Sequence, residues 1–357
     1  MNIGIIVNPT DKKQTGIGYY GTNLLRNLKK TKTKDNKYIL LKNLGSTVPK
    51  RIILGSLKLP RIVRNQSLDI VHDLTQAPPF LFDTKSKKVV TVHDLTRKIF
   101  PEFHSTTGNF VNKITLKSNF KKADKIIADS NNTKKDLIQH FQIKPQKITV
   151  IYGAANKNFK PIKNRKILNK VEKKYYLPQQ FILYVGTLEP RKNIVRLLKA
   201  YASVSEKIKI NLVIAGKKGW KYTEIFETYH KLKLNDKVIF TGYLERQDLP
   251  AIYNLAKLFV YPSLYEGFGL PPLEAMACGC PVITSNTSSL PEVVGSAGIM
   301  INPYSVDGLT NTIKQILINK DLRKILTKKG LKQAKKFSWE KAARETLKVY
   351  EKLMNKS

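Results

Sequence analysis

The sequence predicts an α/β fold built from two doubly wound parallel sheets. Short apolar segments alternate with amphipathic segments along the 357 residues, a pattern typical of parallel strands joined by helices. The chain is also long enough for two domains of ordinary size. A basic stretch from Lys157 to Gln180, with prolines at 161 and 178, divides the apolar segments into two sets. We therefore expect two Rossmann-like domains with their boundary in this stretch.

The first set contains six strand candidates, each a short apolar run. These are Ile3 to Val7, Tyr38 to Lys42, Ile70 to His72, Lys88 to Val92, Lys125 to Ala128 and Ile148 to Ile151. The first strand leads through a loop with Gly16 and Gly18 into a helix that ends near Lys30. Glycines at such a turn let the backbone approach a phosphate or a sugar. After the fifth strand, Ser130 is expected to cap a helix.

The second set also contains six candidates. These are Phe181 to Val185, Asn211 to Ala215, Val238 to Thr241, Leu258 to Tyr261, Pro281 to Thr284 and Gly298 to Ile301. After the fourth of them, Pro271 and Pro272 can open a helix, because proline's missing N–H costs nothing in a first helical turn. The last segment, from Phe337 to Leu353, has the pattern of an amphipathic helix with Ser338 as its N-cap.

The composition suits a folded protein and raises a question about partners. With 41% hydrophobic residues, the chain can form sizeable cores. Its net charge of +38, from 64 Lys+Arg against 26 Asp+Glu, fits an anionic membrane surface, an anionic substrate or nucleic acid. No basic stripe interleaves with aromatics, so nucleic acid is the disfavoured partner. The even spread of lysines is also what compositional bias alone would produce.

We expect a cytoplasmic location, which includes a peripheral position on the inner face of the cell membrane. The chain starts directly with a strand-like run and shows no signal-peptide pattern, and no apolar run approaches the roughly 18 residues of a membrane span. Cys278 and Cys280 stand between a predicted helix and a predicted strand, with too few other ligands nearby for a metal site. We interpret them as small buried residues.

Two carboxylates with seven residues between them flank a glycine loop in the second domain. The segment reads Glu266-Gly-Phe-Gly-Leu-Pro-Pro-Leu-Glu274. Its glycines allow close approach to a ligand, and the amides at the helix start favour an anionic or hydroxyl-rich group. Glu274 is expected in the first helical turn and Glu266 in the loop before it. A ligand with both phosphates and hydroxyls, such as a nucleotide sugar, fits this arrangement.

This segment and the residues after it, through Cys280-Pro-Val-Ile-Thr284, resemble the signature of the retaining glycosyltransferases of family 4. The motifs Val-His93-Asp-Leu and Gly186-Thr-Leu-Glu-Pro-Arg-Lys192-Asn resemble further motifs of that family. The resemblance covers nearly the whole chain and implies the glycosyltransferase B (GT-B) fold, with two domains facing across a cleft. Residues 1–160 would form the acceptor-side domain, with the helix at 337–355 packing back on it. Residues 161–336 would form the nucleotide-sugar domain.

The resemblance also implies roles for the donor site. Arg191 and Lys192, which follow Gly186 in a tight loop, would neutralise charge on the departing nucleoside diphosphate. Glu274 would bind the ribose hydroxyls. The remaining donor contacts would come from the backbone near Tyr243 and Leu244, which reads the base, and from Glu266, Gly267, Phe268, Gly269 and Leu270, which hold the sugar.

His93 stands at the carboxyl end of a predicted buried strand, where ligands meet open α/β sheets. Taken alone, it is interpreted as a histidine that is hydrogen-bonded to Asp94. The resemblance implies instead that it points into the cleft near the transferred sugar, where it would bond a hydroxyl or relay a proton. Gly16 and Gly18 would form the acceptor or phosphate loop, although Thr15 and Tyr19 replace the Gly and Arg usual there.

The resulting hypothesis is a hexosyltransferase of cell-envelope polysaccharide biosynthesis. It would move a hexose, with retention, from a nucleotide sugar to a hydroxyl of a glycan or lipid-linked acceptor. The motifs are most similar to those of mannosyltransferases, so GDP-mannose is the preferred donor and UDP-glucose or another UDP-hexose the next. No Asp-x-Asp motif lies beside a predicted cleft strand, and we expect neither a metal nor a cofactor. The alternatives are a phosphorylase or epimerase of the same fold, or a basic protein that binds RNA or membrane through an inactive sugar-nucleotide domain.

Overall fold

The computed structural model describes residues 1–7, 16–31, 36–42, 60–75, 85–103 and 116–355. The chain forms two compact units, each with its own sheet. The first unit comprises Met1–Gly153 and Ser338–Ser357, and the second comprises Ala154–Phe337. The expected boundary, between residues 160 and 161, falls a short way inside the second unit.

The first unit contains a six-stranded parallel sheet in the order β2-β1-β3-β4-β5-β6. Its strands are β1 (Asn2–Val7), β2 (Lys37–Lys42), β3 (Ile70–Asp73), β4 (Lys87–Val92), β5 (Lys125–Ala128) and β6 (Ile148–Val150). Its helices include α1 (Gly16–Lys30), α3 (Thr96–Ile99), α5 (Asn131–Phe141) and α14 (Trp339–Met354), with the 3₁₀ turns η1 (Pro101–Phe103) and η2 (Pro145–Lys147). The six strand predictions are confirmed, and the bounds differ by at most one residue.

Burial explains why these strands could be recognised. All four residues of β3 and most of β4 are buried, because helices cover both faces of a parallel sheet and favour continuous apolar runs over alternation. Ser130 confirms its predicted role, since its side chain accepts a hydrogen bond from the N–H of Thr133 at the start of α5. One prediction is wrong: Gly16 and Gly18 lie in the first turn of α1 rather than in a loop before it.

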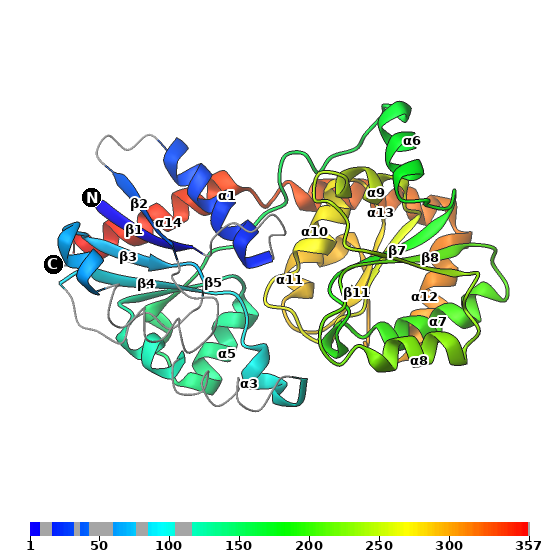
Figure 1. Cartoon of the computed structure of the whole chain (residues 1–357), viewed down its shortest axis with the longest axis horizontal. Helices are drawn as coiled ribbons and strands as arrows, with labels where there is room; N and C mark the ends of the chain where they lie inside the picture. The colour runs from blue at the N-terminus through cyan, green and yellow to red at the C-terminus, as the bar shows by residue number, and fades with distance from the viewer. Residues whose placement is uncertain (8–15, 32–35, 43–59, 76–84, 104–115, 356–357) are drawn as a thin grey trace. The chain divides into compact units, whose positions relative to one another are not determined.

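The last helix, α14, lies beside α1 in the first unit (Figure 1). The hydroxyl of Ser338 accepts a hydrogen bond from the N–H of Lys341 at 3.1 Å, which confirms the predicted N-cap. On the buried face, Trp339 packs edge-on against Tyr20, and the Tyr350 hydroxyl lies 2.6 Å from Nδ1 of His72 in β3. The final helix is therefore part of the core of the first unit.

The second unit contains a parallel sheet in the order β12-β11-β10-β7-β8-β9. Its strands are β7 (Phe181–Val185), β8 (Asn211–Ala215), β9 (Val238–Gly242), β10 (Leu258–Tyr261), β11 (Val282–Ser285) and β12 (Ile299–Ile301). Its helices are α6 (Arg165–Lys174), α7 (Ile194–Ser205), α8 (Thr223–Lys231), α9 (Leu249–Leu255), α10 (Leu270–Ala277), α11 (Leu290–Val294), α12 (Val306–Ile318) and α13 (Lys320–Ala334), with η3 (Pro190–Lys192) and η4 (Gly295–Ala297). These six strand predictions are confirmed as well.

The strand order of the second sheet reverses between β7 and β10. From β7 the chain builds outward through β8 and β9, and from β10 it builds outward through β11 and β12 on the other side. The loops that leave the carboxyl ends of two such strands diverge, and ligands of open α/β sheets bind in the crevice between them. The loops after β7 and β10 are therefore the first place to look for a site.

Candidate active site

The loop after β7 brings two cations to the carboxyl edge of the second sheet. Gly186 directly follows β7, and its N–H donates to the carbonyl of Ala215 in β8 at 2.8 Å. The chain then forms η3, which carries Arg191 and Lys192. The two predicted phosphate-binding cations thus stand at the switch point of the sheet.

Asn193 holds this loop against the segment that follows β10. It adopts a left-handed conformation with φ of 61°, which Asn tolerates better than most residues. Its side-chain amide donates to the carbonyls of Pro262 and Pro303 at 2.9 and 2.7 Å. The loops after β7 and β10 are therefore joined by hydrogen bonds, which fixes the position of the cations.

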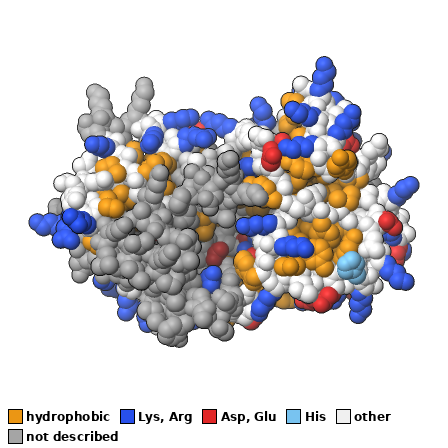
Figure 2. Space-filling model, in the orientation of Figure 1, with side chains coloured by type: hydrophobic (Ala, Val, Ile, Leu, Met, Phe, Trp, Pro, Cys, Tyr) orange, Lys and Arg blue, Asp and Glu red, His pale blue; other side chains and the backbone are white. Residues whose placement is uncertain are grey.

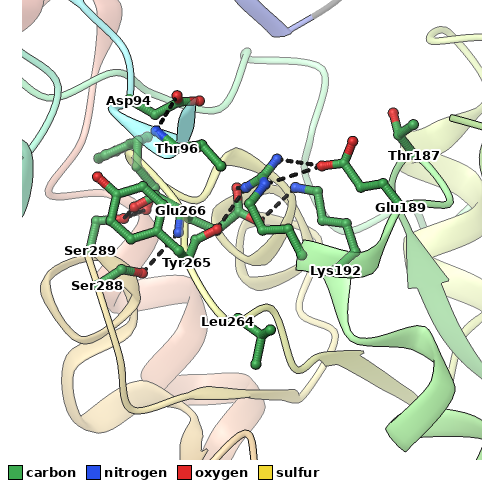
Figure 3. A network of polar contacts seen from close by, with 12 residues as sticks. Asp94, Thr96, Thr187, Glu189, Lys192, Leu264, Tyr265, Glu266, Ser288 and Ser289 are labelled. Atoms are coloured by element: carbon green, nitrogen blue, oxygen red, sulfur yellow. Dashed lines mark hydrogen bonds and ion pairs between the residues drawn. The ribbon is translucent and has the colours of Figure 1, made fainter. Parts of the chain in front are cut away.

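Arg191 and Lys192 both bind Glu266, from the loop after β10. Nζ of Lys192 lies 2.6 Å from Oε1 of Glu266, and Nη1 of Arg191 lies 3.0 Å from Oε2. Lys192 also donates to the hydroxyl of Tyr261 at 2.7 Å, and Arg191 donates to Glu189 through Nε and Nη2. Figure 3 shows Glu189, Lys192 and Glu266 converging from these two loops.

The charged groups of this cluster are almost fully buried. Glu189, Lys192 and Glu266 are 2%, 7% and 8% exposed, so water screens their charges little. Burial by itself would raise the pKa of Glu266, but Arg191 and Lys192 outweigh burial and hold it at about 2. Burial and Arg191 lower the pKa of Lys192, and Glu266 opposes them. Two cations thus face two carboxylates, and a bound diphosphate would compete with those carboxylates for the same N–H donors.

The loop that carries Glu266 is itself held by two serines. The N–H of Glu266 donates to the hydroxyl of Ser288 at 2.9 Å, and the hydroxyl of Ser289 lies within hydrogen-bond distance of the carbonyls of Glu266 and Phe268. Gly269 follows with φ of 120°, a conformation that L side chains rarely adopt. The predicted sugar loop, including Gly267, therefore has a defined conformation that ends at the start of α10.

Glu274 lies one turn deeper than predicted. Helix α10 begins at Leu270, before Pro271 and Pro272, so Glu274 falls in its second turn and not in its first. The missing N–H of each proline costs nothing at these positions, which is why the helix can start ahead of them. The side chain of Glu274 is 1% exposed, and its contacts are accordingly made with protein groups.

The sequence analysis missed the partner of Glu274, which is Arg246. This arginine lies in the loop between β9 and α9 and donates to both carboxylate oxygens of Glu274, at 3.2 Å through Nη1 and also through Nη2. Its guanidinium stacks on Phe159 at 4.8 Å. A single arginine among 64 basic residues gives no sequence signal; only its place two residues after Leu244 could have pointed to it.

The predicted base-reading residues precede Arg246 on the same loop. Tyr243 directly follows β9 and is 40% exposed, whereas Leu244 is 5% exposed. The structure thus brings the predicted donor residues to the carboxyl ends of β7, β9 and β10 in one sheet. Their contact with a donor stays a prediction.

His93 belongs to the first unit and has partners other than the expected one. Its Nδ1 lies 2.7 Å from Oδ2 of Asp129, and its Nε2 lies 2.9 Å from the carbonyl of Leu74. Asp94 accepts instead from the N–H of Thr96. Both partners of His93 accept hydrogen bonds; burial lowers its pKa, but Asp129 and the Leu74 carbonyl outweigh burial and raise it to about 9. A sugar hydroxyl would have to replace the bond to Leu74, so ligand contact at His93 stays a prediction.

Within the described residues, a cavity and a groove lie outside the cluster of Glu266. In the first unit, Gly18 and Gly21 of α1 line a mostly apolar cavity of about 220 Å³. In the second unit, a groove of about 1450 Å³ lies beside α6 and α13, next to the residues that precede β7, β10 and β11. Seven Lys and Arg side chains and a single Glu line this groove: Arg165, Glu172, Lys173, Lys257, Lys320, Arg323, Lys324 and Lys328. It opens at the amino ends of these strands, away from the predicted donor site.

Neither a metal site nor a membrane span is found in the part of the chain that the structure describes. There, no three His, Cys, Asp or Glu side chains gather so that they could hold a metal ion. No described helix is long and apolar enough to cross a membrane. Cys278 and Cys280 are buried free thiols, as predicted.

Comparison with known proteins decides the family. Residues 163–333 match the model of glycosyl transferases group 1, and residues 35–158 match that of glycosyltransferase family 4. The O-antigen chain mannosyltransferase B of Escherichia coli is 36% identical over 75% of this chain and 71% of its own. The chain belongs to glycosyltransferase family 4. This family-4 enzyme is thus a hexosyltransferase, as the motifs predicted.

Two further comparisons place the family-4 chain among its relatives. The serotype-specific mannosyltransferase WbdA of Escherichia coli is 35% identical over 76% of this chain, which spans about a third (34%) of WbdA. The solved sucrose-phosphate synthase of Thermosynechococcus elongatus superposes with a TM-score of 0.80 at 21% identity, covering 100% of both chains. The latter likeness concerns the fold and confirms the GT-B architecture of two doubly wound units.

Proposed function

We propose that the enzyme transfers mannose from GDP-mannose, with retention of anomeric configuration, to a hydroxyl of a glycan or lipid-linked acceptor. The observation that carries this proposal is the buried cluster of Arg191, Lys192 and Glu266 at the switch point of the second sheet. Such a cluster offers fixed N–H donors to a diphosphate in a site with little water. The choice of mannose is supported by the two Escherichia coli relatives, both named as mannosyltransferases.

The proposed reaction proceeds by attack on the face that the leaving group departs from. The bond between C1 of mannose and the β-phosphate oxygen breaks, and the acceptor oxygen forms a new bond to C1 on the same side. The acceptor proton passes to the departing phosphate oxygen. Arg191 and Lys192 stabilise the charge that grows on the diphosphate, so the chain's own cations supply the electrostatic assistance without a metal.

Each end of the donor has its own group of residues in this proposal. Glu266 and the amides from Gly267 to Leu270 hold the sugar, Glu274 binds the ribose hydroxyls, and the backbone at Tyr243 and Leu244 reads the base. None of these carboxylates is assigned as a general base. The low pKa of Glu266, about 2, suits an ionised acceptor of sugar hydroxyls.

The experiment is a donor panel offered to the full chain. GDP-, UDP- and ADP-sugars are compared by thermal shift, because a ligand at 100 times its Kd stabilises the native state by about 2.7 kcal/mol. Glycan and lipid-diphosphate acceptors are then added with the best donor, and the product anomer is assigned by NMR. We expect GDP-mannose to stabilise the chain and an α-mannoside to form. A response to UDP-hexoses alone would favour the UDP-glucose alternative.

Two lysines of the same region provide matched variants. Lys192→Gln removes a buried donor of the cluster and should lower kcat by about 10² to 10³-fold. Lys199→Gln removes an exposed charge on α7 and should leave kcat unchanged. Absence of both stabilisation and transfer with every donor would contradict the proposed function. RNA or vesicle binding that survives Glu274→Ala would then favour a binding protein with an inactive sugar-nucleotide domain.

An anionic membrane surface is the further partner that we propose, on the observation of the basic groove beside α6 and α13. Figure 2 shows Lys and Arg side chains standing out around α6. The lining has seven cations to one acid, a higher proportion of cations than the 64 to 26 of the whole chain. Phosphate headgroups are anions that such a surface attracts.

A further inference from the structure

Arg246 covers the buried carboxylate of Glu274. Its guanidinium donates through Nη1 to Oε2 and through Nη2 to Oε1, one nitrogen to each oxygen. The side chain of Glu274 is 1% exposed and that of Arg246 is 34% exposed. Arg246 is therefore the member of the pair that faces solvent, and a ligand that reaches Glu274 does so beside the guanidinium.

The fork of Arg246 leaves part of the carboxylate available. A carboxylate has about four lone-pair positions, two on each oxygen, and the guanidinium takes one on each. The hydroxyl of Tyr253 lies 3.5 Å from Oε2, at the limit of a hydrogen bond. Oε1 therefore keeps one further acceptor position, and a ligand hydroxyl at Oε2 would have to replace only the long bond to Tyr253. Two such positions match the two neighbouring hydroxyls of a ribose.

We propose that Arg246 is a positioning residue for the nucleoside end of the donor, because its fork keeps both oxygens of Glu274 oriented and ionised as acceptors for the two ribose hydroxyls. This inference rests on the proposed function, in which Glu274 binds ribose. Cζ of Arg246 also lies over the ring of Phe159, which is 4% exposed, and this contact helps to hold the guanidinium in place. A protonated Glu274 would turn one acceptor oxygen into a donor and would lose one of the two hydroxyl contacts.

Removal of Arg246 should make donor binding depend on pH. Burial raises the pKa of Glu274, and Arg246 is the main group that opposes this rise. The other ionisable groups that face Glu274 are Tyr253 of α9 and Cys278 beyond α10. Burial raises the pKa of both well above their ordinary values, so they stay neutral between about pH 6 and 9. The pKa of Glu274 is raised even beside Arg246, and loss of Arg246 should raise it further without changing the protonation of these two groups.

The experiment measures the Kd of GDP and of 2′-deoxy-GDP by calorimetry between about pH 6 and 9. If UDP is the better ligand in the donor panel, UDP and its 2′-deoxy form replace them. The wild-type chain should prefer the ribonucleotide by about tenfold or more at every pH, which corresponds to one charge-assisted hydrogen bond. In Arg246→Gln the preference should fall toward one at low pH and recover as the pH rises. Arg344→Gln, which removes an exposed arginine of α14, serves as the control and should behave as wild type.

Arg246→Lys separates charge from geometry. The ammonium keeps Glu274 ionised but cannot form the two-pronged contact, so we expect a wild-type pH profile with a weaker ribose preference. If Arg246→Gln and Arg246→Lys both keep the wild-type profile and preference, the inference is wrong, although nucleotide binding stands. If the wild-type chain binds no nucleoside diphosphate, the proposed function itself fails. Thermal unfolding of each variant checks that it is folded. If Arg246→Gln does not fold, the ribose preference of Arg246→Lys tests the inference.

Discussion

His72 and His93 are both buried in the first unit, yet their pKa values move in opposite directions. His72 lies between the hydroxyls of Tyr350 and Thr91, and burial, with a smaller effect of His93, lowers its pKa to about 3. His93 faces a carboxylate and a carbonyl, which outweigh burial and raise its pKa to about 9. Neighbours, and not burial as such, decide the charge of each ring.

The protonated state of His93 should therefore stabilise the first unit in a defined pH range. Its pKa is about 9 in the folded chain and about 6.5 in an unfolded one. The contribution is complete below about pH 6.5 and is lost as the pH rises through 9, and a shift of this size corresponds to about 3 kcal/mol. His93→Gln should thus lower the free energy of unfolding strongly at pH 6 and much less near pH 9.5.

The chain offers a local reporter for this measurement. Trp339 packs on Tyr20, which in turn packs on His93. The second tryptophan of the sequence, Trp220, can be replaced by Phe, so that fluorescence in urea follows the first unit alone. A His93→Gln effect that is equal at both pH values would contradict the assigned charge.

Residue-level partners were the least predictable part of the site. Asp94 was the expected partner of His93 because it is its neighbour in sequence, but successive side chains of an extended segment point to opposite sides. Asp129 follows β5, the strand paired with β4, and therefore reaches the histidine from beside it. Arg246 was missed for a similar reason, since the loop that carries it meets α10 only in the folded unit.

At the scale of the element, α10 stands between two glycines with positive φ. Gly269 precedes it with φ of 120°, and Gly279 follows it with φ of 82°. A Cβ at Gly269 would lie 3.0 Å from Cδ2 of the buried Leu290, whereas one at Gly279 would make only ordinary contacts, 3.5 Å from Thr327. An alanine would thus be strained at both positions, but its Cβ would be crowded only at Gly269.

These two glycines form a matched pair of variants. Each Gly→Ala change should cost about 1 to 3 kcal/mol of unfolding free energy, because alanine is strained at positive φ. Gly269→Ala should also weaken nucleoside diphosphate binding, because the crowded Cβ displaces the start of α10 next to the sugar loop. Gly279→Ala should leave the Kd unchanged. Equal effects of the two variants on Kd would show that the start of α10 does not contact the ligand.

Strands were predictable from the sequence, as were the two helix starts capped by Ser130 and Ser338, whereas the starts of α1 and α10 were not. An apolar run covered on both faces has little choice but a central parallel strand, and β7, β8 and β10 were predicted to the residue. Helix starts depend on one or two backbone angles. Gly16 lies inside α1, because glycine permits a loop but does not require one. Helix α10 begins before its two prolines, because proline is tolerated throughout a first helical turn and does not mark its first residue.

At the scale of the whole molecule, the net charge of +38 should attract an anionic surface most strongly where cations are concentrated. In the second unit, that place is the groove beside α13, where Lys320, Lys324 and Lys328 stand one helical turn apart. Each lysine near an anionic membrane contributes about 1 kcal/mol. Reversal of all three charges should then weaken vesicle binding by at least about a hundredfold.

Sedimentation with phosphatidylglycerol and phosphatidylcholine vesicles measures this effect. The control reverses three exposed lysines of the second unit that do not line the groove, Lys199, Lys207 and Lys231, and so has the same net charge. We expect only the groove variant to lose binding to phosphatidylglycerol. Equal losses in both variants would assign membrane binding to the total charge, and a preference for RNA over vesicles would assign the groove to nucleic acid.

The place of α14 in the first unit bears on how the protein forms during translation. Residues 154–337 make up the second unit as one uninterrupted stretch, but the core of the first unit lacks Trp339 and Tyr350 until the last helix has left the ribosome. Synthesis from the N-terminus therefore delays completion of the first unit until α14 has emerged, although residues 1–153 are made first. Throughout that interval, Tyr20 and His72 lack their α14 partners, and a ribosome stalled before residue 338 should present a first unit that proteases cut readily.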